Sequence, residues 1–129
     1  MSDPEAIFLP SDWLKALCSG DVGAVMDMYS EHAVLVPTFD NEPLQGTEEL
    51  TAYFTEFMSR PNLCGESFGE IDQNLHENHR AISGIYAFSW GADETTTARF
   101  TFVVHFDEDS DEWVIDTQHS SAMPETHIQ

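Results

Sequence analysis

The sequence has 129 residues, of which 41% are hydrophobic, and this length suits one domain with a single core. Its 24 Asp and Glu residues face only four Lys and Arg, which gives a formal net charge of −20. Such a surface repels phosphate backbones and anionic lipid headgroups, so it argues against nucleic-acid and membrane binding. Two interpretations of the acidity stay open: adaptation to high salt, where ions screen the self-repulsion, or ordinary charge-based solubility.

Cys18 and Cys64 lie far apart in the sequence, and neither belongs to a metal-binding or redox motif. We therefore expect two buried free thiols in a reducing compartment, the cytoplasm. Of the six His, only His76 and His79 are close together, which predicts no metal site and no cofactor. We expect a single domain over residues 1–129, with flexible ends at 1–9 and 126–129.

Helical patterns fill the first half of the chain. Ser11 is a suitable N-cap for a first helix that Gly20 ends, and Asp21 is a suitable N-cap for the second. The second helix carries an apolar stripe of Val22, Val25, Met26 and Tyr29. A short strand over 33–36 should stop at Pro37. Thr47 is a suitable N-cap for a third helix, whose apolar residues repeat at helical spacing: Leu50, Tyr53, Phe54, Phe57 and Met58.

Strand patterns fill the second half. We predict strands over 68–76, 82–90, 97–106 and 112–121, with a turn at 77–80 and a charged hairpin loop at 107–111. Helices followed by strands predict an α+β fold in which a bent antiparallel sheet wraps around the helices. The strands have apolar residues to bury on both faces, so a partner subunit should cover the face that the helices leave open. A homo-oligomer, most simply a dimer, is expected.

Parts of the sequence resemble a known family. The opening, WLKALCSGDVGAVMDMYSEHAVLVPTF, is similar to the start of the nuclear transport factor 2-like superfamily. The segments GIYAFSW, ARFTFVVHF and HSSAMPE resemble bacterial relatives of the calcium/calmodulin-dependent protein kinase II association domain. The resemblance covers residues 13–125 and implies a cystatin-like cone, with three N-terminal helices packed on the sheet.

Some members of this group are iota-class carbonic anhydrases, which work without a metal. The resemblance implies that Thr38, Tyr53 and Ser121 hold bicarbonate, and it matches the buried Arg of association domains to Arg99. The first His of the paired-His motif is Gln118 in this chain. If that His transfers protons, the substitution removes the group that does so.

The last strand offers chemistry of its own. Alternation puts His119, Ser121 and Thr117 on one patch above the apolar Trp113 and Ile115. A neutral imidazole can accept a proton near neutral pH, and hydroxyls can orient a water or an anion. The pattern therefore predicts a polar small-molecule pocket; the alternative is a strand end that faces solvent.

Arg99, Ser120 and Tyr86 complete the predicted ligand-binding residues. Arg99 lies in the middle of a strand, where a charge must be paired or must face a cavity. It could hold a carboxylate or bicarbonate, or it could form a structural ion pair with Asp116 or Glu70. Ser120 points away from His119 unless a bulge intervenes.

Three functions follow from these residues. The first is an iota-class carbonic anhydrase-like enzyme that hydrates CO2 to bicarbonate without a metal, with His119 as the general base and Thr38, Tyr53 and Ser121 around the substrate. The alternative is a non-catalytic domain for oligomerisation or small-ligand binding. A third, ketosteroid-isomerase-like chemistry, needs a carboxylate base in an apolar cone. Asp116, the nearest candidate, points away from His119.

Overall fold

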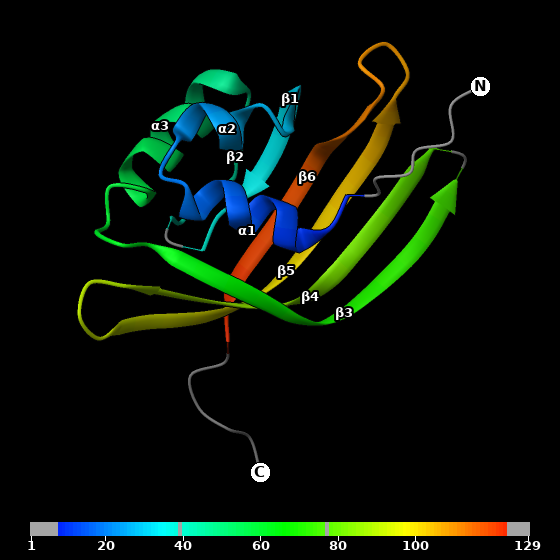
Figure 1. The fold of residues 1–129 in the computed structure, drawn as a ribbon. Coiled ribbons are helices and arrows are strands. Elements are labelled where there is room, and N and C mark those ends of the chain that lie inside the picture. The colour runs from blue at the N-terminus through cyan, green and yellow to red at the C-terminus, as the bar shows by residue number, and fades with distance from the viewer. Residues whose placement is uncertain (1–7, 39, 77, 124–129) are drawn as a thin grey trace.

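A computed structural model describes residues 8–38, 40–76 and 78–123, and shows three helices packed on one curved sheet (Figure 1). In chain order the elements are α1 (Pro10–Cys18), α2 (Val22–Met26), β1 (Tyr29–Val36), β2 (Leu44–Gln45), α3 (Thr47–Phe57), β3 (Cys64–His76), β4 (His79–Trp90), β5 (Glu94–Asp107) and β6 (Glu112–Ala122). The α+β class and the three early helices are confirmed.

The six strands form a single sheet in the order β2-β1-β6-β5-β4-β3. The six strands make five neighbouring pairs, of which four are antiparallel and one, β1 with β6, is parallel, so the sheet is mixed where the sequence predicted an antiparallel one. The parallel pair arises because α3 and the strands β2 to β5 intervene between β1 and β6 in the chain. This crossover places the end of β1 beside the end of β6.

Local chemistry sets where the helices begin. The carboxylate of Asp21 accepts hydrogen bonds from the backbone N–H groups of Gly23 (3.0 Å) and Ala24 (3.4 Å), which confirms it as the N-cap of α2. The predicted N-caps Ser11 and Thr47 are wrong, because both residues already lie inside their helices. The N-cap of α1 is Leu9, since Pro10 fits the first helical position, and the N-cap of α3 is Gly46. The second helix is shorter than predicted: Tyr29 already belongs to β1.

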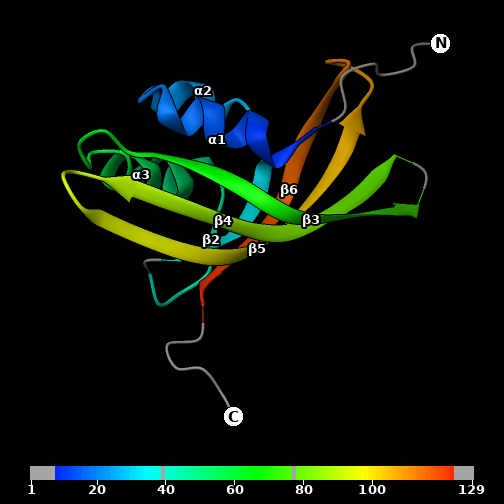
Figure 2. The same cartoon turned by 60° about the horizontal axis from the view of Figure 1, so that its bottom comes forward.

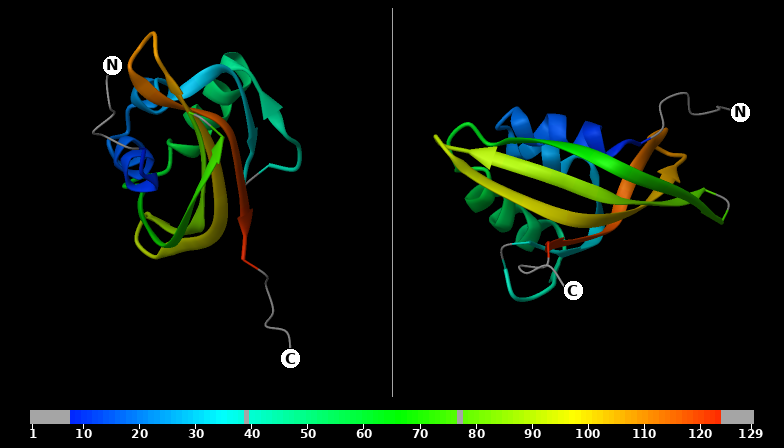
Figure 3. Two further views of the ribbon diagram at one scale, coloured as in Figure 1. Left: turned by 90° about the vertical axis from the view of Figure 1, so that its right-hand side faces the viewer. Right: turned by 90° about the horizontal axis from the view of Figure 1, so that it is seen from below.

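The core lies between the helices and one face of the sheet. Figure 2 shows the helices on the same side of the sheet, and Figure 3 (right) looks onto the other face, which no described helix covers. We call these the inner and the outer face. Trp13 of α1 is at the centre of the core and stacks on Tyr86 of β4, with ring centroids 5.4 Å apart. Phe8, just before α1, is buried against Phe102 of β5.

Cys18 and Cys64 form a disulfide, so the prediction of two free thiols is wrong. The bond joins the last residue of α1 to the first residue of β3, which are 46 positions apart in the sequence. The two residues meet because α1 packs across the start of β3, and their Cα atoms lie 4.5 Å apart. The argument for a reducing compartment loses its basis.

Candidate functional site

A register shift in β6 reverses the predicted direction of its polar side chains. Thr117 pairs with Val103 of β5 while Ile115 pairs with the next residue, Val104, so Asp116 is an extra residue in β6. Ile115 still points into the core, but after the bulge Gln118 (1% exposed) and Ser120 (4%) also point inward. His119 is exposed on the outer face, so the prediction that it faces an interior pocket with Ser121 is wrong.

Six polar side chains on the inner side form one continuous chain of hydrogen bonds. Trp13 Nε1 donates to the Tyr29 hydroxyl (2.9 Å), which donates to Gln118 Oε1. Gln118 Nε2 donates to the Tyr86 hydroxyl (3.2 Å), which donates to Ser120 Oγ (2.6 Å). Ser120 in turn bonds Thr38 Oγ1. An indole can only donate, so it sets the direction of donation as far as Ser120.

Gln118 is the residue that makes this chain continuous. Its amide accepts from one tyrosine and donates to another, and it carries no group that titrates near neutral pH. Sequence analysis recorded Gln118 only as a departure from a family motif, and it missed Tyr29 and Trp13. Tyr29 was assigned to the apolar stripe of the second helix, where its hydroxyl gave no separate signal, and the Trp13 indole had no predicted role.

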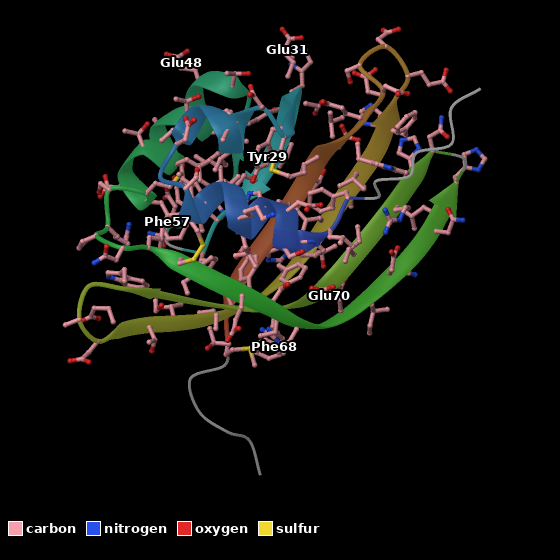
Figure 4. The ribbon with its side chains drawn as sticks, viewed as in Figure 1. Tyr29, Glu31, Glu48, Phe57, Phe68 and Glu70 are labelled. Carbon is pink, nitrogen blue, oxygen red and sulfur yellow. A yellow bond between two sulfur atoms is a disulfide. The ribbon has the colours of Figure 1, made fainter. Side chains whose placement is uncertain are left out.

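The cavity beside this chain is small. Its volume is about 10 Å³, at the lower limit for one water molecule. The described residues that line it include Thr38, Tyr53, Tyr86, Gln118 and Ser120, together with Trp13, Leu35, Pro37, Phe54, Phe57 and Phe88. None of these is a His, an acid or a base. Six of these eleven lining residues are aromatic, and their rings take up most of the space around the cavity. Figure 4 shows Tyr29 and Phe57 on the side of the sheet where the helices lie.

Burial raises the pKa of both tyrosines in the chain. Desolvation is the main cause of the raised pKa of the Tyr29 and Tyr86 hydroxyls. Side-chain hydrogen bonds lower the pKa in part: the bond with Trp13 does so for Tyr29, and the bonds with Ser120 and Gln118 do so for Tyr86. Both hydroxyls therefore stay protonated at neutral pH. They can donate hydrogen bonds but cannot act as general bases there.

These pKa values predict a loss of stability in alkali. Above pH ~10 the unfolded chain ionises both tyrosines, whereas the folded chain keeps their protons. The contribution of the two tyrosines to the free energy of unfolding is fully present below that pH. Above it, each tyrosine removes up to about 1.4 kcal/mol of unfolding free energy per pH unit. Urea unfolding of the wild type and Tyr29→Phe between pH 9 and 11 measures this. The variant should lose stability about half as steeply; equal slopes would contradict the prediction.

The other predicted residues meet on the outer face. Arg99, Thr101, His119 and Ser121 line an open hollow of about 230 Å³, together with Phe100. Arg99 is exposed, so its match to a buried Arg is wrong. Neither alternative partner pairs with it: Asp116 bonds His105 (2.7 Å) and Glu70 accepts from Ser67 (2.6 Å). The eight predicted residues thus separate into an inner set (Thr38, Tyr53, Tyr86 and Ser120) and an outer set (Arg99, Thr117, His119 and Ser121).

Within the described ranges, no group of three or more His, Cys, Asp or Glu side chains could hold a metal ion. The described helices are all too short or too polar to cross a lipid bilayer.

The cone of three helices on a curved mixed sheet is the nuclear transport factor 2-like, or cystatin-like, fold. Residues 9–125 match the SnoaL-like domain model, and the chain belongs to this family. No curated protein matches the chain.

Solved structures agree with this assignment. The chain is 29% identical to a protein from Xanthomonas campestris that was assigned as a calcium/calmodulin dependent protein kinase II association domain, over 98% of this chain and 99% of that one, with a TM-score of 0.81. An NTF2-like protein of unknown function from Pseudomonas putida KT2440 is 14% identical over 92% and 90% of the two chains, with a TM-score of 0.77. A structure from Parabacteroides distasonis assigned as a ketosteroid isomerase is 19% identical over 86% and 82%, with a TM-score of 0.71.

Proposed function

We propose that this chain is a non-catalytic association domain, and that two copies assemble through the outer face of the sheet. The observation that carries the proposal is a block of the outer face without carboxylates on a chain whose net charge is −20. The likeness to the Xanthomonas campestris association domain, at 29% identity over nearly the whole of both chains, supports it.

The block is defined by strand register, because residues directly opposite each other on paired strands share a face. Three rows cross β3, β4, β5 and β6, and we call their residues the association face. The rows are Gln73, Ala81, Val103 and Thr117; Ile71, Ser83, Thr101 and His119; and Phe68, Ile85, Arg99 and Ser121. Arg99 is the only permanently charged residue among them.

Two exposed apolar residues mark this face. Ile71 is 68% exposed and Phe68 is 49% exposed, and Figure 4 shows Phe68 on the side of the sheet away from the helices. A second copy would bury both, at roughly 25 cal/mol per Å² of apolar surface removed from water. Face-to-face contact of this block also brings no carboxylate of the association face into the interface. A second copy of this chain is therefore the partner that fits best.

This proposal predicts a mass of twice the 14.5 kDa chain by light scattering. Two copies of charge −20 repel each other, so raising NaCl from 0.05 to about 0.5 M should tighten the dimer. Val103→Glu puts a carboxylate on the association face, and we expect it to weaken the dimer at least about tenfold, because like charges then oppose across a desolvated contact.

Thr95→Glu is the matched control. Thr95 lies on the same strand and, by alternation, on the same face, but outside the block, so this change adds the same charge without touching the association face. A wild type that stays monomeric in 0.5 M NaCl, or equal weakening by both variants, would refute the proposal.

Metal-free CO2 hydration is a second candidate function. The observation in its favour is that Thr38, Tyr53 and Ser120 border one interior cavity, with Ser120 where Ser121 was expected. The described lining supplies no base that accepts a proton at neutral pH, and Gln118 cannot replace the missing His. Stopped-flow CO2 hydration with a chelator should therefore match the rate in buffer alone. The enzyme hypothesis would be supported by a rate above that of buffer that is lost in Ser120→Ala and unchanged in Thr95→Glu.

A further inference from the structure

We infer that Arg99, Thr101, His119 and Ser121 form a binding site for a small oxyanion, a carboxylate or a phosphate, on the outer face of the sheet. This goes beyond assembly, because the site needs only one copy of the chain. The four residues come from two neighbouring strands: Arg99 pairs with Ser121, and Thr101 pairs with His119. Their side chains therefore lie in adjacent rows of one face.

The space and the lining suit such a ligand. The hollow measures about 230 Å³, whereas a water molecule in the liquid occupies about 30 Å³. The described residues that line it contribute a guanidinium, two hydroxyls and an imidazole, with Phe100 as the fifth member. All four polar groups can donate hydrogen bonds, and none is a carboxylate that would repel an anion.

Arg99 is the main reason to expect an anion. It has no ion-pair partner among the described residues, although the chain contains 24 acids. Its neighbours across the strands are Ile85 and Ser121, which leave the guanidinium unneutralised. A guanidinium presents its donors as a planar fork that matches two oxygens of a carboxylate or phosphate.

The neighbouring hydroxyl is held in place by the sheet. Ser83 Oγ and Thr101 Oγ1 lie 3.0 Å apart and share a hydrogen bond, so one hydroxyl fixes the other. When Ser83 donates, the Thr101 proton is free to point at a ligand. The net charge of −20 opposes an approaching anion, but at 0.15 M ionic strength this repulsion is screened beyond about 8 Å. The local donors then decide binding.

The test is a titration at constant pH and ionic strength, in which inorganic phosphate or acetate replaces chloride. Histidine side-chain NMR follows the signal of the His119 imidazole, which is assigned by its absence from the spectrum of His119→Gln. We expect a saturable shift, an affinity at least tenfold lower in Arg99→Gln, and an unchanged affinity in the control Arg60→Gln. Arg60 stacks over Phe57 and Trp90, outside the site. The tighter of the two probes identifies the preferred class of oxyanion.

A closed dimer could hide the site, so the titration is repeated on Phe68→Ser/Ile71→Ser, which lacks the two exposed apolar side chains of the association face. Only linear shifts in both proteins, or equal affinity in wild type and Arg99→Gln, would overturn the inference. The failure of the association proposal is distinguishable: a monomeric wild type with a saturable shift refutes assembly alone, and a dimer without any saturable shift refutes the anion site alone.

Discussion

Reducing the Cys18–Cys64 disulfide should lower the free energy of unfolding by about 4 kcal/mol, the value that loop-closure entropy gives for a bond across 46 positions. In the unfolded chain the bond closes a loop made of the residues that fold into α2, β1, β2 and α3. Reduction opens this loop and raises the conformational entropy of the unfolded chain. The folded chain changes less, because Trp13, Leu14 and Leu17 keep α1 in the core. Urea unfolding with and without reductant, followed by tryptophan fluorescence, measures the difference.

The double variant Cys18→Ser/Cys64→Ser is the matched control. It should be as unstable as the reduced wild type, and reductant should not change it further. If the wild type keeps its full stability after a thiol assay has counted two free cysteines, the disulfide contributes nothing and the prediction fails. A loss of about 4 kcal/mol is a large fraction of the 5–15 kcal/mol typical of small proteins, so the redox state of this bond would decide whether the domain persists at elevated temperature.

The helices were predictable because their signals are local. Asp21 caps α2 through side-chain bonds to residues two and three positions later, and the apolar spacing of α3 reports its buried face directly. The start of β1 was harder to predict. Tyr29 fits the helical stripe of α2 equally well, and its place in β1 depends on pairing with Ile115 of β6, a contact that no local pattern encodes.

The direction of the polar residues in β6 could not be predicted for a related reason. Trp113 and Ile115 mark one face of the strand, but no apolar residue follows between positions 116 and 121. The bulge at Asp116 shifts the register by one residue, which reverses every later side chain, and a polar run carries no alternation that would reveal the shift. The disulfide was missed because only the packing of α1 on β3 brings the two cysteines together.

The interior hydrogen-bond chain gives a prediction of similar size. Gln118→Glu keeps the shape of the side chain and replaces the amide with a carboxyl group. When protonated, that group can accept from Tyr29 and donate to Tyr86 as the amide does, so the variant should be nearly as stable as the wild type in acid. When ionised, it can only accept, and its charge lies where Gln118 is 1% exposed, without a cation in the described lining.

The sign follows from the burial. Desolvation should raise the pKa of this carboxyl above the unfolded value of about 4.3, so its stabilisation is complete below that pH and is lost as pH rises. Each unit removes up to about 1.4 kcal/mol, which amounts to roughly 3 to 4 kcal/mol by pH 7. Urea unfolding at pH 4.5, 5.5 and 7 measures the difference in unfolding free energy between the variant and the wild type. The other acids titrate alike in both proteins, so their contribution cancels in this difference.

Gln118→Leu separates charge from packing in the same experiment. It leaves the Tyr29 hydroxyl without its acceptor and Tyr86 without a donor, which should cost about 2 to 4 kcal/mol at every pH, because nothing at that position titrates. A Gln118→Glu difference that also stays constant with pH would mean that water reaches the carboxyl, and that the chain from Trp13 to Thr38 is open to solvent. A difference that grows only above pH ~4.3 requires a chain of hydrogen bonds that is continuous and closed to water.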